Sequence, residues 1–203
     1  MKKLIKWIGV LVLFLIVLGY AELQLDVNRL QNDLIRLHVV ANSDSEQDQS
    51  NKLAVRDAVL NYLEPVLAQL SDKEQAQQFL SQHLAELTSL VNKVLSDLQT
   101  GQQATVSLQK ESFATREYDT FSLPAGIYDS LRIEIGEGDG KNWWCVAFPS
   151  LCVPKTEEAF CNAAVSSGFD SRLTGTLTRR GNYEIRFFLL DCIGKLGNFF
   201  QRG

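Results

Sequence analysis

The sequence has no dense run of lysine or arginine in its body, which argues against a nucleic-acid-binding protein. The 203 residues carry 20 basic and 24 acidic side chains, a formal charge of −4 with pI near 5.3, whereas DNA and RNA partners need a basic surface. With 45% hydrophobic residues, the chain also lacks the composition of a disordered protein. These absences leave a folded chain long enough to bury a core, as one domain or as one domain with a helical appendage.

Histidine is scarce too, and the cysteines are not spaced as metal ligands. Only His38 and His83 are present, and structural zinc sites place Cys and His ligands in close pairs. The gap between Cys145 and Cys152 is too wide for such a pair. We therefore expect no metal and no cofactor.

Charge is distributed unevenly along the chain. Residues 1–21 hold three lysines and no acid, an apolar run at 8–18, and the small-residue stretch Gly19-Tyr20-Ala21. This pattern is typical of an export signal cut after Ala21. An uncleaved membrane tether through residues 4–21 is the alternative, although a membrane span needs about 20 apolar residues. In either case residues 22–203, with 17 basic and 24 acidic side chains and a charge of −7, lie outside the cytoplasm, because the lysines stay inside.

Export changes the interpretation of the four cysteines. All fall in the last third of the chain, at Cys145, Cys152, Cys161 and Cys192. Outside the cell, paired disulfides are the expected state, and four cysteines allow three connectivities.

Helical patterns occupy the first half of the body. After a linker at 22–33, residues 34–41 resemble a strand, and Ser43 with Glu46, or Ser45 with Asp48, can cap the next helix. Apolar residues at helical spacing predict helices over 55–70 and 80–98, arranged as an antiparallel hairpin. Pro65 predicts a kink or break near Glu64, and Ser71 with Glu74 a second cap.

Strand patterns follow. Residues 104–110, 131–135 and 143–148 have strand character, with the Gly136–Gly140 segment predicting a tight hairpin between the last two. Further on we expect a short helix at 157–165, a strand at 183–190 and a helix at 191–200. Residues 34–203 are therefore predicted to form a single α+β domain, a mostly antiparallel sheet packed by a helical hairpin on one face.

A cysteine hydrolase or amidase acting on cell-wall peptide is one function to weigh. Cys145 would be the nucleophile, His38 the base and Asp44 its orienting carboxylate. A disulfide to Cys152 would leave no thiolate to attack, and His38 would then be an ordinary strand residue.

Two consecutive tryptophans offer a binding role instead. Trp143 and Trp144 should point to opposite faces of a strand, and an exposed indole is a plausible contact hot spot for a protein or a wall glycan. The alternative is that the indoles only cover the sheet edge.

Two arginines are candidates for ion pairs. Arg36 and Arg56 could pair with Asp57 or Asp44, which would tie the strand to the helix. The alternative is that such pairs form only at the solvated surface.

Two motifs resemble the stage II sporulation protein R family. The first is RLHVVANSDS at 36–45, with Asp48-Gln49 and VRDAVL at 55–60. The second comprises LPAGIY at 123–128, LRI at 131–133, GEG at 136–138, NWWC at 142–145, Phe148-Pro149 and Leu151-Cys152. The resemblance covers residues 34–152, and the block from NWWC to Leu151-Cys152 is its most specific part.

The resemblance implies a signal between two cells. Members of this family are exported from the forespore into the space between its membrane and that of the mother cell. There they trigger stage II sporulation protein GA, a membrane-embedded aspartic protease that matures pro-sigma-E, and they are not enzymes themselves.

The resemblance also suggests specific residues. Cys145 and Cys152 belong to the pattern and are expected to be bridged, whereas Cys161 and Cys192 are not part of it. No catalytic residue is expected. The predicted partner-binding surface, which we call the motif surface, brings the two motifs together, and its members are Asn42, Ser43, Asp44, Asn142, Trp143 and Trp144. The alternative is that the two motifs only specify the fold.

Overall fold

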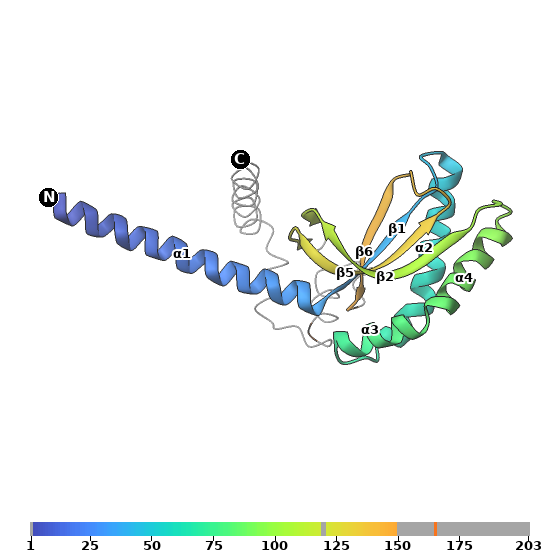
Figure 1. The fold of residues 1–203 in the computed structure, drawn as a ribbon, viewed down its shortest axis with the longest axis horizontal. Coiled ribbons are helices and arrows are strands. Elements are labelled where there is room, and N and C mark those ends of the chain that lie inside the picture. The colour runs from blue at the N-terminus through green and yellow to red at the C-terminus, as the bar shows by residue number, and fades with distance from the viewer. Residues whose placement is uncertain (1, 119–120, 150–164, 166–203) are drawn as a thin grey trace.

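The structure is a computed structural model that describes residues 2–118, 121–149 and 165, and its core is a four-stranded sheet (Figure 1). The strands are β1 (Ile35–Val40), β2 (Ala104–Phe113), β5 (Gly126–Ile135) and β6 (Asn142–Phe148), in the order β2-β5-β1-β6. Only β1 and β5 are parallel, whereas β2 with β5 and β1 with β6 are antiparallel. The predicted α+β class with a mostly antiparallel sheet is confirmed.

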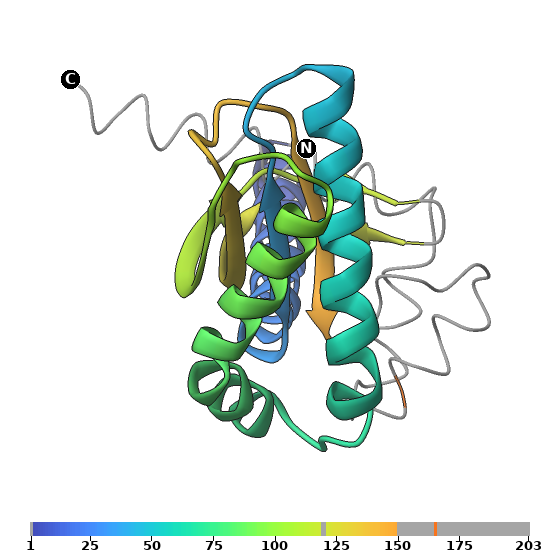
Figure 2. The same cartoon turned by 90° about the vertical axis from the view of Figure 1, so that its right-hand side faces the viewer.

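Helices cover one face of this sheet (Figure 2). They are α2 (Glu46–Leu67), α3 (Lys73–Gln82) and α4 (Leu84–Asp97). Apolar residues at helical spacing form the buried stripes of α2 and α4, namely Val55, Val59, Leu63, Leu87, Val91 and Leu95. They pack on the sheet residues Leu37, Val39, Leu131 and Ile133. Burial of these stripes supplies the main driving force for the fold.

Three details of the helices differ from the sequence-based expectation. Helix α2 continues through Pro65 to Leu67, because Pro65 lies in its last turn and buried Leu67 holds that turn against the core. The cap of α3 is Asp72, whose side chain accepts from the Gln75 amide, rather than Ser71. The predicted helix 80–98 is divided at His83, whose ring stacks on Phe79 at 4.0 Å.

The predicted tight hairpin at Gly136–Gly140 is wrong. β5 and β6 do not pair with each other, because β1 lies between them. The loop instead crosses the end of β1, where the Gly140 amide donates to Ala41 O at 2.9 Å and the Asp139 amide to Asn42 O at 3.2 Å. The reason is that β1 is buried at every position, as a central strand is, and alternation within one strand does not identify its neighbours.

A separate short sheet precedes β5. It pairs β3 (Arg116–Glu117) with β4 (Ser122–Leu123), two residues on each side. Phe121 and Leu123 of this segment are buried. The short sheet therefore packs on the domain without joining the larger sheet.

The N-terminal segment is one helix, α1 (Lys2–Asp33), which projects from the sheet (Figure 1). It includes residues 22–33, for which the sequence analysis expected a linker. Its C-terminal end is docked, since Val27 and Leu30 are buried and Lys73 at the start of α3 donates to Gln31 O and pairs with Asp129 of β5 at 2.6 Å. The span Lys6–Asp33 is long and apolar enough to cross a membrane, which is compatible with a signal sequence.

The predicted elements at 183–190 and 191–200, and nearly all of the helix at 157–165, lie outside the described residues.

Candidate functional site

The first motif forms a hydrogen-bonded corner between β1 and α2, centred on Asp48. Its carboxylate accepts from Asn42 Nδ2 at 2.9 Å, Ser43 Oγ at 2.5 Å and Gln102 Nε2 at 2.6 Å. The hydrogen bonds from Ser43, Asn42 and Gln102 outweigh burial and lower the pKa of Asp48 to about 2. The predicted Ser45 cap is confirmed, because Ser45 Oγ accepts from the Asp48 amide at 3.1 Å.

The same corner holds the loop between β5 and β6. Asn42 Oδ1 accepts from the Glu137 amide at 3.0 Å, and Asp44 Oδ1 from the Lys141 amide at 2.7 Å. Two loop glycines approach the corner closely, since a Cβ added at Gly136 would meet the Asn42 side chain and one added at Gly140 would meet the backbone oxygen of Ser43. The side chains of Asn42 and Asp44 thus join the two motifs, which the structure brings together as predicted, while the Ser43 side chain bonds Asp48 within the first motif. Whether these residues also bind a partner stays a prediction.

The tryptophans of β6 lie on opposite faces of the sheet, as predicted. Trp143 packs against the core on the helix-covered face, with the Arg56 guanidinium 4.3 Å from its ring centroid. Trp144 lies on the other face, stacked on His38 at 5.6 Å and covered by the Arg116 guanidinium at 3.7 Å. Each indole therefore carries a cation on its ring.

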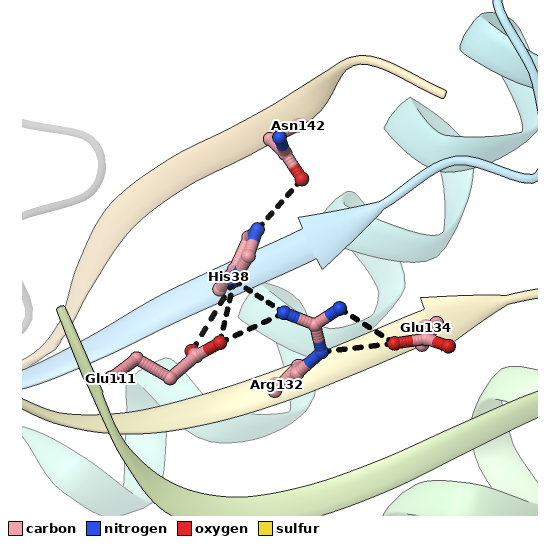
Figure 3. A network of polar contacts seen from close by, with 5 residues as sticks. All are labelled: His38, Glu111, Arg132, Glu134 and Asn142. Carbon is pink, nitrogen blue, oxygen red and sulfur yellow. Dashed lines mark hydrogen bonds and ion pairs between the residues drawn. The ribbon is translucent and has the colours of Figure 1, made fainter. Parts of the chain in front are cut away.

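The face that carries Trp144 has a charged network at its centre (Figure 3), and we call it the polar face. His38 Nδ1 is 3.2 Å from both Glu111 oxygens, and its Nε2 is 2.8 Å from Asn142 Oδ1. Arg132 bridges two carboxylates, at 2.8 Å from Glu111 and 2.6 Å from Glu134. Burial alone would raise the pKa of Glu111, but its neighbours, Arg132 and His38 among them, outweigh it and lower that pKa. The polar face comprises Arg36, His38, Glu111, Arg132, Glu134, Asn142 and Trp144.

Sequence reasoning missed most of this network. Arg132 and Glu134 alternate with apolar residues in β5, which indicated only that they leave the core. No sequence pattern pointed to Glu111. Its contact with His38 exists because β2 and β1 lie on either side of β5, and no local pattern encodes that strand order.

The structure does not support the cysteine hydrolase. Cys145 is buried on the helix-covered face and is disulfide-bonded, whereas the neighbouring His38 points to the polar face. Asp44 bonds the Lys141 amide rather than the His38 ring. Nucleophile, base and orienting carboxylate are therefore not assembled. The cysteines at 152, 161 and 192 lie outside the described residues, so the predicted pairing of Cys145 with Cys152 stays a prediction.

The suggested arginine pairs are formed only in part. Arg56 pairs with Asp57 at 2.6 Å, but both belong to α2, so the pair does not tie a strand to a helix. Arg36 pairs with neither Asp57 nor Asp44, and instead donates to the hydroxyl of Tyr118 at 2.7 Å.

Comparison with known proteins places these features in a family. The family model of stage II sporulation protein R matches residues 31–158. The chain belongs to this family. The match includes all six motif-surface residues and the Cys145–Cys152 segment. It leaves out nearly all of α1.

One curated family member can also be aligned with this chain, over about half of its own length. Stage II sporulation protein R of Bacillus subtilis (strain 168) is 38% identical over 118 residues, which are 58% of this chain and 53% of that protein. The chain therefore spans about half the length of the curated relative it matches. No solved structure matches the chain.

Proposed function

We propose that this protein is an exported sporulation signal that activates stage II sporulation protein GA, the membrane-embedded aspartic protease that matures pro-sigma-E in the mother cell. It would act in the space between the forespore and mother-cell membranes. Membership of the stage II sporulation protein R family supports a role in sporulation, and the apolar helix α1 supports export.

The observation that carries the proposal is the joining of the two family motifs in one corner of the domain. Asn42 and Asp44 fix the loop that leads into β6, and β6 then carries Trp144 on the polar face and Trp143 on the helix-covered face, packed against the core. A loop held at both ends presents its side chains with little ordering cost on binding. The arrangement suits a binding surface.

Activation would follow from differential binding. A ligand shifts an equilibrium only by binding one state better than the other. The motif surface would bind the extracytoplasmic part of the protease more tightly in its active, dimeric state. The protein would thus supply binding free energy and no chemistry.

Separate Trp143→Ala and Trp144→Ala variants test this surface, with pro-sigma-E processing as the readout. We expect processing to fall at least tenfold in one of them, because interface tryptophans commonly contribute about 2 kcal/mol or more. Ile127→Ala is the matched control, since Ile127 is an apolar strand residue, 60% exposed, outside the motif surface. Normal processing by both tryptophan variants, each folded as judged by circular dichroism, would remove these residues from the contact.

A wall-glycan binding module would also use an indole, and the candidate is Trp144, which is half-buried on the polar face. Pull-down with purified peptidoglycan separates the two functions. Retention of the wild type but not of Trp144→Ala on peptidoglycan would favour the glycan module.

A further inference from the structure

Arg36 is a buried cation without a counterion in the part of the chain that the structure describes. Its side chain has no exposed surface, and its one hydrogen bond runs from Nη2 to the Tyr118 hydroxyl. Nε and Nη1 are buried and have no hydrogen-bond partner. A buried, unbonded donor costs free energy and is rare in folded proteins.

The surroundings of Arg36 are aromatic rather than acidic. Its guanidinium carbon lies 4.1 Å from the ring centroid of Phe113 and 5.4 Å from that of Tyr128. The Tyr128 hydroxyl is turned away, because it donates to Pro124 O at 2.8 Å. Burial lowers the pKa of Arg36, with the two tyrosines opposing it, but an arginine keeps its charge in proteins.

Two other cations of the domain, Arg132 and Lys73, are paired with carboxylates, and the buried Lys52 ammonium has oxygen acceptors, whereas Nε and Nη1 of Arg36 have none. Arg132 contacts the carboxylates of Glu111 and Glu134, and Lys73 contacts Asp129 at 2.6 Å. A buried charge is tolerated when a counterion and further hydrogen bonds compensate its lost hydration. Arg36 has two free donors, Nε and Nη1, but no counterion among the described residues.

We propose that Arg36 is the seat for a carboxylate carried by an acidic segment of the partner protein, which reaches the polar face by displacing Tyr118. This inference rests on the proposed function, because it takes the protease as the source of that segment. Planar guanidinium donors match a carboxylate well.

A second cation on the same side supports an acidic segment. Arg116 lies on the ring of Trp144, and it forms no ion pair with any described residue. Two unpaired guanidinium groups near one face fit a segment with more than one carboxylate.

Tyr118 lies at the end of a short sheet that is separate from the four-stranded sheet. It follows β3, whose ladder with β4 consists of Arg116 opposite Leu123 and Glu117 opposite Ser122. Beyond it, the Tyr118 amide donates to Phe121 O at 2.7 Å and the two rings stack at 4.6 Å. Displacing Tyr118 breaks its described contacts with Arg36 and Phe121, and none of these is a strand-pairing hydrogen bond of the four-stranded sheet.

Acetate is the probe for this seat, added to the full chain in detergent micelles with ¹⁵N-labelled arginine. We expect a saturable shift of the Arg36 Nε–H signal with sodium acetate that sodium chloride at equal ionic strength does not produce. The Tyr118→Phe variant should bind acetate several-fold more tightly, because the competing hydroxyl is gone. An Arg36 signal that acetate does not move, in the wild type and in Tyr118→Phe, would overturn the proposal.

Replacement by methionine separates a seat from a structural bond. Arg36→Met should keep or raise the melting temperature, because it removes an uncompensated charge, whereas Arg132→Met should lower it by leaving two carboxylates unpaired. A fall in Arg36→Met as large as in Arg132→Met would show that the chain itself satisfies Arg36, and would overturn the proposal.

Processing of pro-sigma-E identifies the source of the carboxylate. We expect folded Arg36→Met to lose at least tenfold in processing, and normal processing by that variant would rule out the protease as the source. Failure of the wild type to drive processing would instead refute the proposed function, with the acetate titration still deciding whether the seat exists.

Discussion

Ser43 donates a 2.5 Å hydrogen bond to the carboxylate of Asp48, across the junction between β1 and α2. Asn42 and Gln102 donate to the same carboxylate. These donors arrive from the end of β1 and from the segment before β2, so one buried acid fixes three parts of the chain. The corner that presents the second motif depends on this acid.

Replacing Asp48 with asparagine should destabilise the protein in a pH-dependent way. The pKa of Asp48 is lowered from 3.8 to about 2, so its contribution to stability is complete above about pH 4 and is lost as pH falls toward 2. At pH 7 the free energy of unfolding should fall by about 1–3 kcal/mol, because the half-buried donors of Asn42, Ser43 and Gln102 lose a charged acceptor. Urea unfolding at pH 7 and at pH 3 should show the difference from wild type shrinking in acid. Asp57→Asn, which alters an exposed carboxylate, is the control, and a difference that does not change with pH would contradict this account.

Breaking the ion pair between Lys73 and Asp129 should weaken the packing of the C-terminal end of α1 on the domain. Both side chains are about one-tenth exposed, and Asp129→Asn leaves the Lys73 ammonium without its counterion while Gln31 O remains bonded. We expect a loss of about 3 kcal/mol in the free energy of unfolding, measured by thermal or urea unfolding. Asp57→Asn breaks the more exposed Arg56 pair and should cost no more than about 0.5 kcal/mol. Equal effects of the two variants would show that burial of the Lys73 pair does not matter.

Gly140 should not tolerate a side chain. The added Cβ of alanine would lie 2.3 Å from the Ser43 carbonyl oxygen, which is backbone and cannot turn aside. Gly140→Ala should cost about 2 kcal/mol and should also reduce processing, because the loop before β6 must shift. Gly101 has φ +69° and open space around it, so Gly101→Asn, which tolerates that conformation, is a nearly neutral control. Wild-type stability and processing in Gly140→Ala would show that the two motifs need not touch.

Cys145 should have no free thiol in the native protein. It is buried and disulfide-bonded, and we expect peptide mapping without reduction to recover it joined to Cys152. Iodoacetamide labelling of the unreduced native chain should leave Cys145 unmodified. Labelling at Cys145 would contradict this and would revive the cysteine hydrolase. Recovery of Cys145 joined to Cys161 or Cys192 would correct only the pairing.

Local patterns in the sequence predicted the elements but not their neighbours. Alternation of Leu131, Ile133 and polar residues identified β5, because the rule depends on one strand and one buried face. The insertion of β1 between β5 and β6 was not predictable in this way, since strand order depends on long-range pairing. The break at His83 was also missed, because the apolar stripe continues on both sides of it.

The candidate site was predictable to the same extent. The motifs around Asn42 and Asn142 stood out through their resemblance to the stage II sporulation protein R family, and the structure places them together. The role of Glu111, and the contact of Asp48 with Gln102, could not be seen, because these partners are brought near only by the folded topology. The lack of a counterion at Arg36 could not be predicted either, because the sequence contains several acids and does not show that none of them pairs with it among the described residues.

Reconstitution in a non-sporulating host tests the central claim most directly. The full chain is co-expressed with stage II sporulation protein GA and pro-sigma-E, and a matched strain expresses the chain without residues 1–21. We predict that processed sigma factor accumulates when all three proteins are present, and that it falls to background when the export signal at residues 1–21 is removed. Unprocessed pro-sigma-E in the presence of the full chain, or equal processing without it, would contradict the account.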